Sequence, residues 1–182
     1  MAHALTYLCS ESTTRVLIFN CTSGRSGSGF LTTILDTIDL QLQRQNIGYS
    51  AKTFFDRVIF CTNVTYMDGG SKPGRSMLLL YAKANPVGLN LVASPDFVSL
   101  GTPESSLEKL TVQNELATAW SSLVPEFPPS HVHVLPSIQH AVEVIRSIQG
   151  QSKSLDILVC GSLHLVGGII EVADLAEIAL HS

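Results

Sequence analysis

Short apolar runs alternate with stretches of helical periodicity along most of this chain. Residues 15–20 and 57–62 are nearly continuous apolar and β-branched runs that end at polar loops, which is typical of buried parallel strands. After the first run, leucine and isoleucine recur at helical spacing and predict an amphipathic helix over about 29–45. The pattern therefore begins with a strand, a helix and a second strand.

Helical periodicity resumes after residue 103. An apolar stripe that includes Trp120 predicts a helix beginning near Pro103, where Ser105 and Glu108 have the spacing of a capping box. The remaining predicted elements are a strand over 131–135, a helix over 138–148 that Ser137 caps, a strand over 155–160 and a last helix from 161 to about 180.

Strands that alternate with helices predict an α/β fold, a Rossmann-like parallel sheet with helices on both faces. We expect a single domain over residues 1–182, with 1–14 as an N-terminal leader. The stretch 71–103 contains several proline and glycine breakers and is expected to be an irregular insert. Sites in such sheets lie at the carboxyl ends of the strands, which directs attention to the loops 20–29, 61–70, 135–137 and 160–168.

The composition is apolar for a small domain. Eleven Lys and Arg residues against fifteen Asp and Glu give a formal net charge of −4, which excludes a strongly basic nucleic-acid surface. A mean hydropathy of +0.28 indicates a large apolar pocket, a face hidden against a partner, or a tight core under an uncharged polar surface. No apolar run approaches the roughly 20 residues of a membrane span, and no secretory signal is apparent. We therefore expect a cytoplasmic protein with reduced cysteines.

Two glycine-rich loops carry candidate chemistry. The loop 24–29 follows a strand and opens a helix, where backbone N–H groups with Arg25 and Ser26 suit an anion or a carbonyl. It is neither a Walker A loop nor a GxGxxG motif, because the chain has no Gly-Lys-Ser/Thr and position 32 is threonine. The loop 160–168 supplies Ser162 and His164 at the end of a strand. The structural alternatives are a surface loop and a tight turn in which the histidine is a capping or core residue.

Polar residues also follow the first two strands. We interpret Asn20, Ser26, Asn63, Tyr66 and Asp68 as candidate substrate-binding residues, and Arg25, Ser162 and His164 as candidate catalytic residues. An Asx turn is the structural alternative at Asp68. His131 and His133 share one face of a strand, but two histidines do not make a metal site, and no metal site is predicted.

Four sequence runs carry a family resemblance. RVLIFN, VIFCTNVTYMDGG, LTVQNELATAW and LVCGSLHLVGG resemble the C-terminal domain of fungal-type folylpolyglutamate synthase, a Mur-ligase-like family. The resemblance extends from about Arg15 to Val172, is weakest across 71–95, and implies a Rossmann-like domain. For the family it implies formation of a γ-glutamyl amide on a folate through an acyl phosphate, with ATP and Mg²⁺. The phosphate loop and metal ligands of the family belong to an N-terminal domain that is not among these residues.

This chain departs from the family pattern in two places. The Asp-Gly-Ala-His segment that opens the family's C-terminal domain is missing, and the usual Arg-Asp pair is replaced by Arg25-Ser26. We therefore expect a divergent, stand-alone copy that does not carry out ATP-driven ligation on its own.

Three functions remain open. The preferred one is a cofactor-independent cyclase or isomerase, of the pericyclic Diels–Alder type, acting on an apolar terpenoid or polyketide of specialised metabolism. Binding would hold the substrate in a reactive geometry, and Arg25, Ser162 and His164 would polarise a carbonyl. The alternatives are the glutamate-binding half of a ligase that needs a separate ATP domain, and an inert remnant. Either a homodimer or association with an ATP-domain partner is compatible with the sequence.

Overall fold

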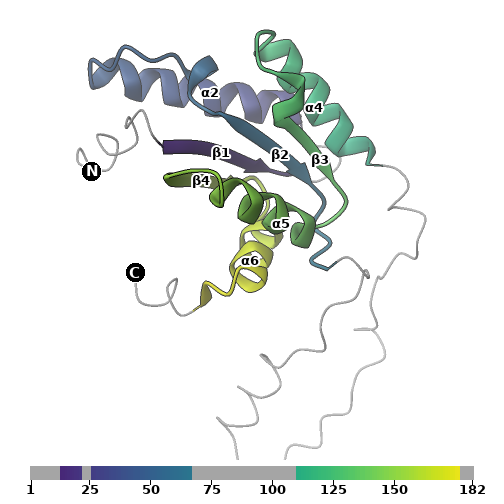
Figure 1. Ribbon diagram of the computed structural model, residues 1–182. Coiled ribbons are helices and arrows are strands. Elements are labelled where there is room, and N and C mark those ends of the chain that lie inside the picture. Colours follow the sequence, from purple (N-terminus) through teal and green to yellow (C-terminus); the bar gives the residue numbers. More distant parts are fainter. Residues whose placement is uncertain (1–12, 22–25, 67–109, 177–182) are drawn as a thin grey trace, which may run out of the picture.

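In the part of the chain that the structure describes, four parallel strands form a single sheet (Figure 1). The computed structural model describes residues 13–21, 26–66 and 110–176. The strands lie in the order β3-β2-β1-β4, and each neighbouring pair is parallel. Their bounds are β1 Thr13–Phe19, β2 Arg57–Cys61, β3 Val132–Leu135 and β4 Ser154–Cys160. The predicted Rossmann-like α/β fold is confirmed.

Helices cover both faces of the sheet, as expected from the alternating elements. On one face, Leu17 and Phe19 of β1 pack in an apolar cluster with α2 and α4. On the other face, Val16 and Ile18 pack in a second cluster with α5 and α6. Successive residues of β1 thus enter opposite cores, because side chains alternate along a strand. The helices are α2 Gly27–Arg44, α4 Thr111–Leu123, α5 Ile138–Gln149 and α6 Leu163–Val172.

Element boundaries differ from the predicted ones in several places. β1 begins at Thr13, inside the expected leader, and α2 begins at Gly27 because Ser26 caps it by accepting a 3.1 Å bond from Gly29 N. The last helix was predicted to reach about residue 180, which is wrong: α6 ends at Val172, and the left-handed backbone of Asp174, at φ 59°, turns the chain away. The predicted start at Pro103, its capping box and the insert lie outside the described residues.

A glycine allows α6 to approach α5 closely. A Cβ at Gly168 would overlap Cδ1 of Ile138, whereas nothing lies within 4 Å of a Cβ at Gly167. We expect Gly168→Ala to lower the free energy of unfolding by about 1–3 kcal/mol, since it overpacks the contact. Gly167→Ala, the matched control, should raise it by up to about 1 kcal/mol, because alanine favours helix.

Urea denaturation of a double-mutant cycle tests this contact. Ile138→Val removes the Cδ1 atom that the new methyl group would meet, so the cost of Gly168→Ala should be smaller in the Ile138→Val background. An equal cost in both backgrounds would contradict the close packing of these two residues.

Candidate functional site

Three strands end side by side at the carboxyl edge of the sheet. Phe19 of β1 is in register with Phe60 of β2 and with Cys160 of β4. The residues that follow these strands, among them Asn20 and Asn63, therefore gather at one edge, where ligands of parallel α/β sheets bind. This edge is the candidate site.

A directed chain of three carboxamides crosses the edge. Gln113 Nε2, from the first turn of α4, donates a 3.0 Å hydrogen bond to Asn20 Oδ1. Asn20 Nδ2 in turn donates a 3.0 Å hydrogen bond to Asn63 Oδ1. Gln113 and Asn20 are buried, whereas Asn63 is half-buried. Buried amides need hydrogen-bond partners, so each buried member of the chain holds the next in a defined orientation.

The turn after β4 packs directly on the backbone of this edge. Gly161 has φ +105°, and a Cβ there would overlap the carbonyl oxygen of Asn20. Ser162, which is buried, follows it and precedes the first turn of α6. Within the described ranges, the Ser162 side chain makes no capping hydrogen bond to α6. The edge thus combines carboxamides, a hydroxyl and the backbone N–H groups of a helix N-terminus, a set of neutral donors suited to an anion.

The segment after β2 is hydrogen-bonded to α5 and α6, which cover one face of the sheet. Val64 and Thr65 accept hydrogen bonds of 2.8 and 2.9 Å from the first backbone N–H groups of α5. Tyr66 follows, and its hydroxyl donates a 2.8 Å hydrogen bond to Glu171 Oε1 on α6. The Tyr66 hydroxyl therefore binds a helix rather than the carboxamide chain.

The remaining candidate residues are dispersed. Ser26 is exposed, and its hydroxyl caps α2. His164 is exposed on α6, so it is not a core residue. Arg25 and Asp68 lie outside the described residues. The structure thus brings Asn20, Asn63 and the turn of Ser162 together, and the roles assigned to all these residues stay predictions.

Sequence reasoning missed Gln113. It lies on the buried side of α4 with Leu116 and Trp120, at i, i+3 and i+7. A polar residue on an apolar helix stripe was the available signal, because a buried amide must find a partner.

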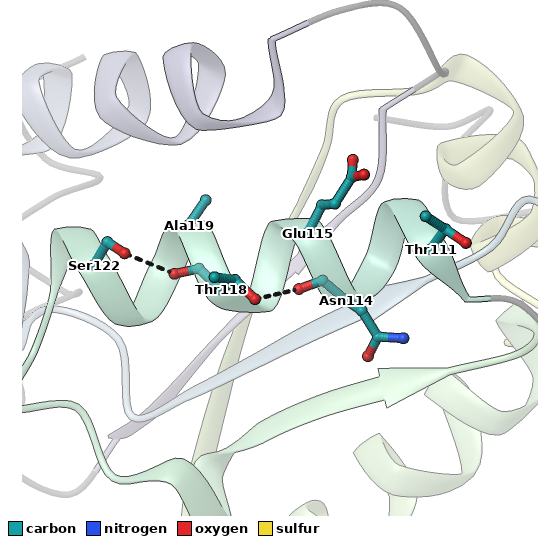
Figure 2. Close-up of a pocket in the computed structure, with 6 residues that line it drawn as sticks. All are labelled: Thr111, Asn114, Glu115, Thr118, Ala119 and Ser122. Carbon is teal, nitrogen blue, oxygen red and sulfur yellow. Dashed lines mark hydrogen bonds between the residues drawn. The ribbon is translucent and has the colours of Figure 1, made fainter.

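A hollow of about 560 Å³ lies along α4 and is lined by none of the three carboxamides. Figure 2 shows its lining residues along one helix, with Asn114 pointing away from Glu115 and Ala119. The Thr118 and Ser122 hydroxyls donate to backbone carbonyls one turn earlier, at 2.9 and 3.0 Å. Because these groups do not converge and the hydroxyls are already bonded, the hollow is a helix surface rather than a reaction site.

Two further hollows are likewise lined by none of the three carboxamides. One of about 570 Å³ is at the amino edge, between residues 52–56 and 124–131. Another, of about 450 Å³, is lined by Ser26, Gly29, Phe30 and Thr33 at the start of α2. Among the residues that the structure describes, no three His, Cys, Asp or Glu side chains are grouped to hold a metal ion.

Two of the thiols are poor nucleophiles near neutral pH. Burial raises the pKa of Cys61 to about 12 and that of Cys160 to about 11. The thiolate is the reactive form of cysteine, so neither side chain is suited to covalent catalysis. Within the described ranges, no helix is long and apolar enough to span a membrane.

His133 on β3 should make stability depend on pH. Burial lowers its pKa below the usual 6.5, and Arg57 and His131 lower it further. The unfolded chain therefore takes up this proton first, and stability should fall as pH drops from about 6.5 toward the lower folded-state pKa. Urea denaturation between pH 8 and 5 should show a flatter profile for His133→Gln. The exposed His164→Gln serves as control, and equal slopes for both variants would refute the assignment.

Comparison with known proteins identifies fungal folylpolyglutamate synthases as relatives of this chain. The chain is 30% identical over 167 residues to the folylpolyglutamate synthase of Neurospora crassa, a match that covers 90% of this chain and 25% of that protein. It is 33% identical over 129 residues to the folylpolyglutamate synthase of Saccharomyces cerevisiae strain YJM789, covering 71% of this chain and 19% of that protein. No protein-family model and no solved structure matches the chain. The expected resemblance is confirmed: the chain belongs to the folylpolyglutamate synthase family and spans about a quarter or less of the length of these relatives.

Proposed function

We propose that this chain is the glutamate-binding half of a ligase similar to folylpolyglutamate synthase, acting with an ATP-binding domain outside these 182 residues. The observation that carries the proposal is the match itself. It covers 71–90% of this chain but only 19–25% of the relatives. Such coverage fits one domain of a larger ligase better than it fits a cyclase.

The carboxyl edge has the chemistry for a carboxylate ligand. A half-buried carboxamide, a serine hydroxyl and the N-terminus of α6 offer hydrogen-bond donors to an anion. Glutamate carries two carboxylates, whereas an apolar terpenoid or polyketide would leave the buried donors without partners, at a cost in binding. The edge therefore favours the ligase proposal over the cyclase that the composition first indicated.

Phosphate chemistry must come from elsewhere in such a ligase. The sequence contains no Gly-Lys-Ser/Thr for a Walker A loop. Leu163, the residue after Ser162, is 88% exposed, and Ile157 and Leu158, within the edge strand β4 that leads to the site, are 40% and 41% exposed. In this proposal an ATP-binding domain docks over these apolar side chains and presents the activated substrate to the carboxyl edge.

Thermal unfolding with added ligands tests the proposal. L-glutamate at 100 times its Kd should raise the free energy of unfolding by about 2.7 kcal/mol, and a panel of apolar polyenes should leave it unchanged. Ser162→Ala should reduce the glutamate effect, whereas Ser147→Ala, an exposed serine on α5, should retain it. Stabilisation by polyenes alone would favour the cyclase, and no effect of any ligand would favour an inert remnant.

A further inference from the structure

We propose that Gln113 is a positioning residue that sets the direction of the carboxamide chain, so that Asn63 presents N–H donors and the edge selects a carboxylate. The proposal rests on the glutamate-binding function above and names the residue that decides which ligand charge the edge accepts. Gln113 itself is 6% exposed and lies behind Asn20. It therefore acts on the ligand through the carboxamides of Asn20 and Asn63 rather than by direct contact.

The hydrogen bonds define the direction. A carboxamide has an acceptor oxygen and a donor nitrogen. Asn20 Oδ1 accepts from Gln113, and Asn63 Oδ1 accepts from Asn20. Asn63 Nδ2 makes no hydrogen bond within the part of the chain that the structure describes. Because Asn63 is half-buried, a ligand can reach this nitrogen. Asn63 Nδ2 is therefore the end of the carboxamide chain from which a ligand can accept a hydrogen bond.

The opposite direction would present the opposite chemistry. If Gln113 offered an oxygen, Asn20 would donate to it and Asn63 would donate to Asn20. Asn63 Oδ1 would then lie at the edge, where an acceptor repels a carboxylate and suits an ammonium group. Because Asn20 and Gln113 are buried, water cannot replace a missing hydrogen bond between their amides. The orientation of the Gln113 amide therefore determines that of Asn20, and the Asn20 amide determines that of Asn63.

The substitution Gln113→Glu tests the proposal in the full chain. A carboxylate at 113 can only accept, so Asn20 must turn to donate to it and Asn63 must turn in consequence. Sodium acetate is the probe, added to ¹⁵N-labelled protein against sodium chloride at equal ionic strength. We expect acetate to shift the Asn63 side-chain amide signals of the unsubstituted protein, and Gln113→Glu to weaken acetate binding about tenfold.

Three other variants separate direction from charge and from folding. Asn114→Asp adds the same charge at an exposed neighbouring position of α4 and should leave the acetate affinity within about twofold. Gln113→Met is neutral and removes the donor, so its loss of affinity should be smaller than that of Gln113→Glu. Asn63→Asp keeps the acceptor for Asn20 but removes the terminal donors, so acetate binding should be lost while the Asn20 amide signals stay in place.

The outcomes distinguish this inference from the proposed function. Acetate shifts at Asn63 without any effect of L-glutamate would keep the inference and reject the glutamate proposal. L-glutamate binding without change at Asn63 would keep the proposed function and overturn the inference. Equal acetate affinity for Gln113→Glu and the unsubstituted protein, or an equal loss in Asn114→Asp, would also overturn it.

Discussion

Replacing Gly161 with alanine is expected to lower the free energy of unfolding by about 4 kcal/mol. Its φ of +105° is a conformation that residues with a Cβ rarely adopt. The added Cβ would also overlap the carbonyl oxygen of Asn20 and lie 2.9 Å from the ring of Phe19. A backbone carbonyl in the central strand's extension cannot move aside as a flexible side chain can. Because small domains are stable by only about 5–15 kcal/mol, this loss is a large fraction of the total free energy of unfolding.

Chemical denaturation followed by circular dichroism measures this effect. Gly150→Ala is the matched control, because Gly150 has φ −63° and the nearest atom to its Cβ would be 3.6 Å away. The control should stay within about 1 kcal/mol of the unsubstituted protein. A Gly161→Ala protein of unchanged stability would show that the turn after β4 does not lie against Asn20.

The sheet and its helices could be predicted because each element shows its burial locally. The apolar runs ending at Asn20 and at Thr62 are buried on both sides, as parallel strands are. The apolar face of α5 and its N-cap at Ser137 could also be predicted from the sequence, and Ser137 Oγ accepts a 3.3 Å hydrogen bond from His140 N. The end of α6 could not be predicted, because the residues after Val172 remain apolar and helix-compatible while Asp174 adopts a left-handed backbone.

The candidate site was predictable only as far as strand topology decides it. Parallel strands end at one edge, which places Asn20 near Asn63. Tyr66 lies only three residues further, but hydrogen bonds between its segment and the start of α5 carry it toward Glu171. Such contacts join residues far apart in the sequence, so spacing along the chain cannot reveal them.

Arg15 illustrates the same limit at the other end of β1. The sequence shows only a charged residue at the start of an apolar strand. In the structure its side chain is buried, with the guanidinium 4.9 Å from the ring centre of Phe54 and 5.5 Å from that of Tyr49. It also donates a 3.1 Å hydrogen bond to the Phe54 carbonyl. Burial of a cation depends on partners from a segment some distance away, which local patterning does not show.

Trp120→Ala is expected to cost about 3–5 kcal/mol of unfolding free energy, because it leaves a large cavity in the core. The indole is fully buried, and its ring centre lies 6.2 Å from that of Phe55 and 5.4 Å from that of Phe127. The substitution should therefore remove packing contacts of the connection before β2 and of the loop before β3 as well as those of α4. Phe30→Ala, at a 42% exposed aromatic residue, is the control and should cost about 1 kcal/mol.

Trp120→Phe separates the aromatic packing from the polar atom of the indole. Among the residues that the structure describes, the buried Trp120 Nε1 has no hydrogen-bond partner, and such an unsatisfied donor costs about 1–3 kcal/mol in the folded state. Phenylalanine removes this donor but retains one ring against Phe55 and Phe127, so it should lose less than half of what alanine loses. Circular dichroism is the required measurement, because the chain has one tryptophan and both variants remove its fluorescence. Equal losses for Phe and Ala would show that the cavity left by the missing ring atoms outweighs removal of the orphaned N–H.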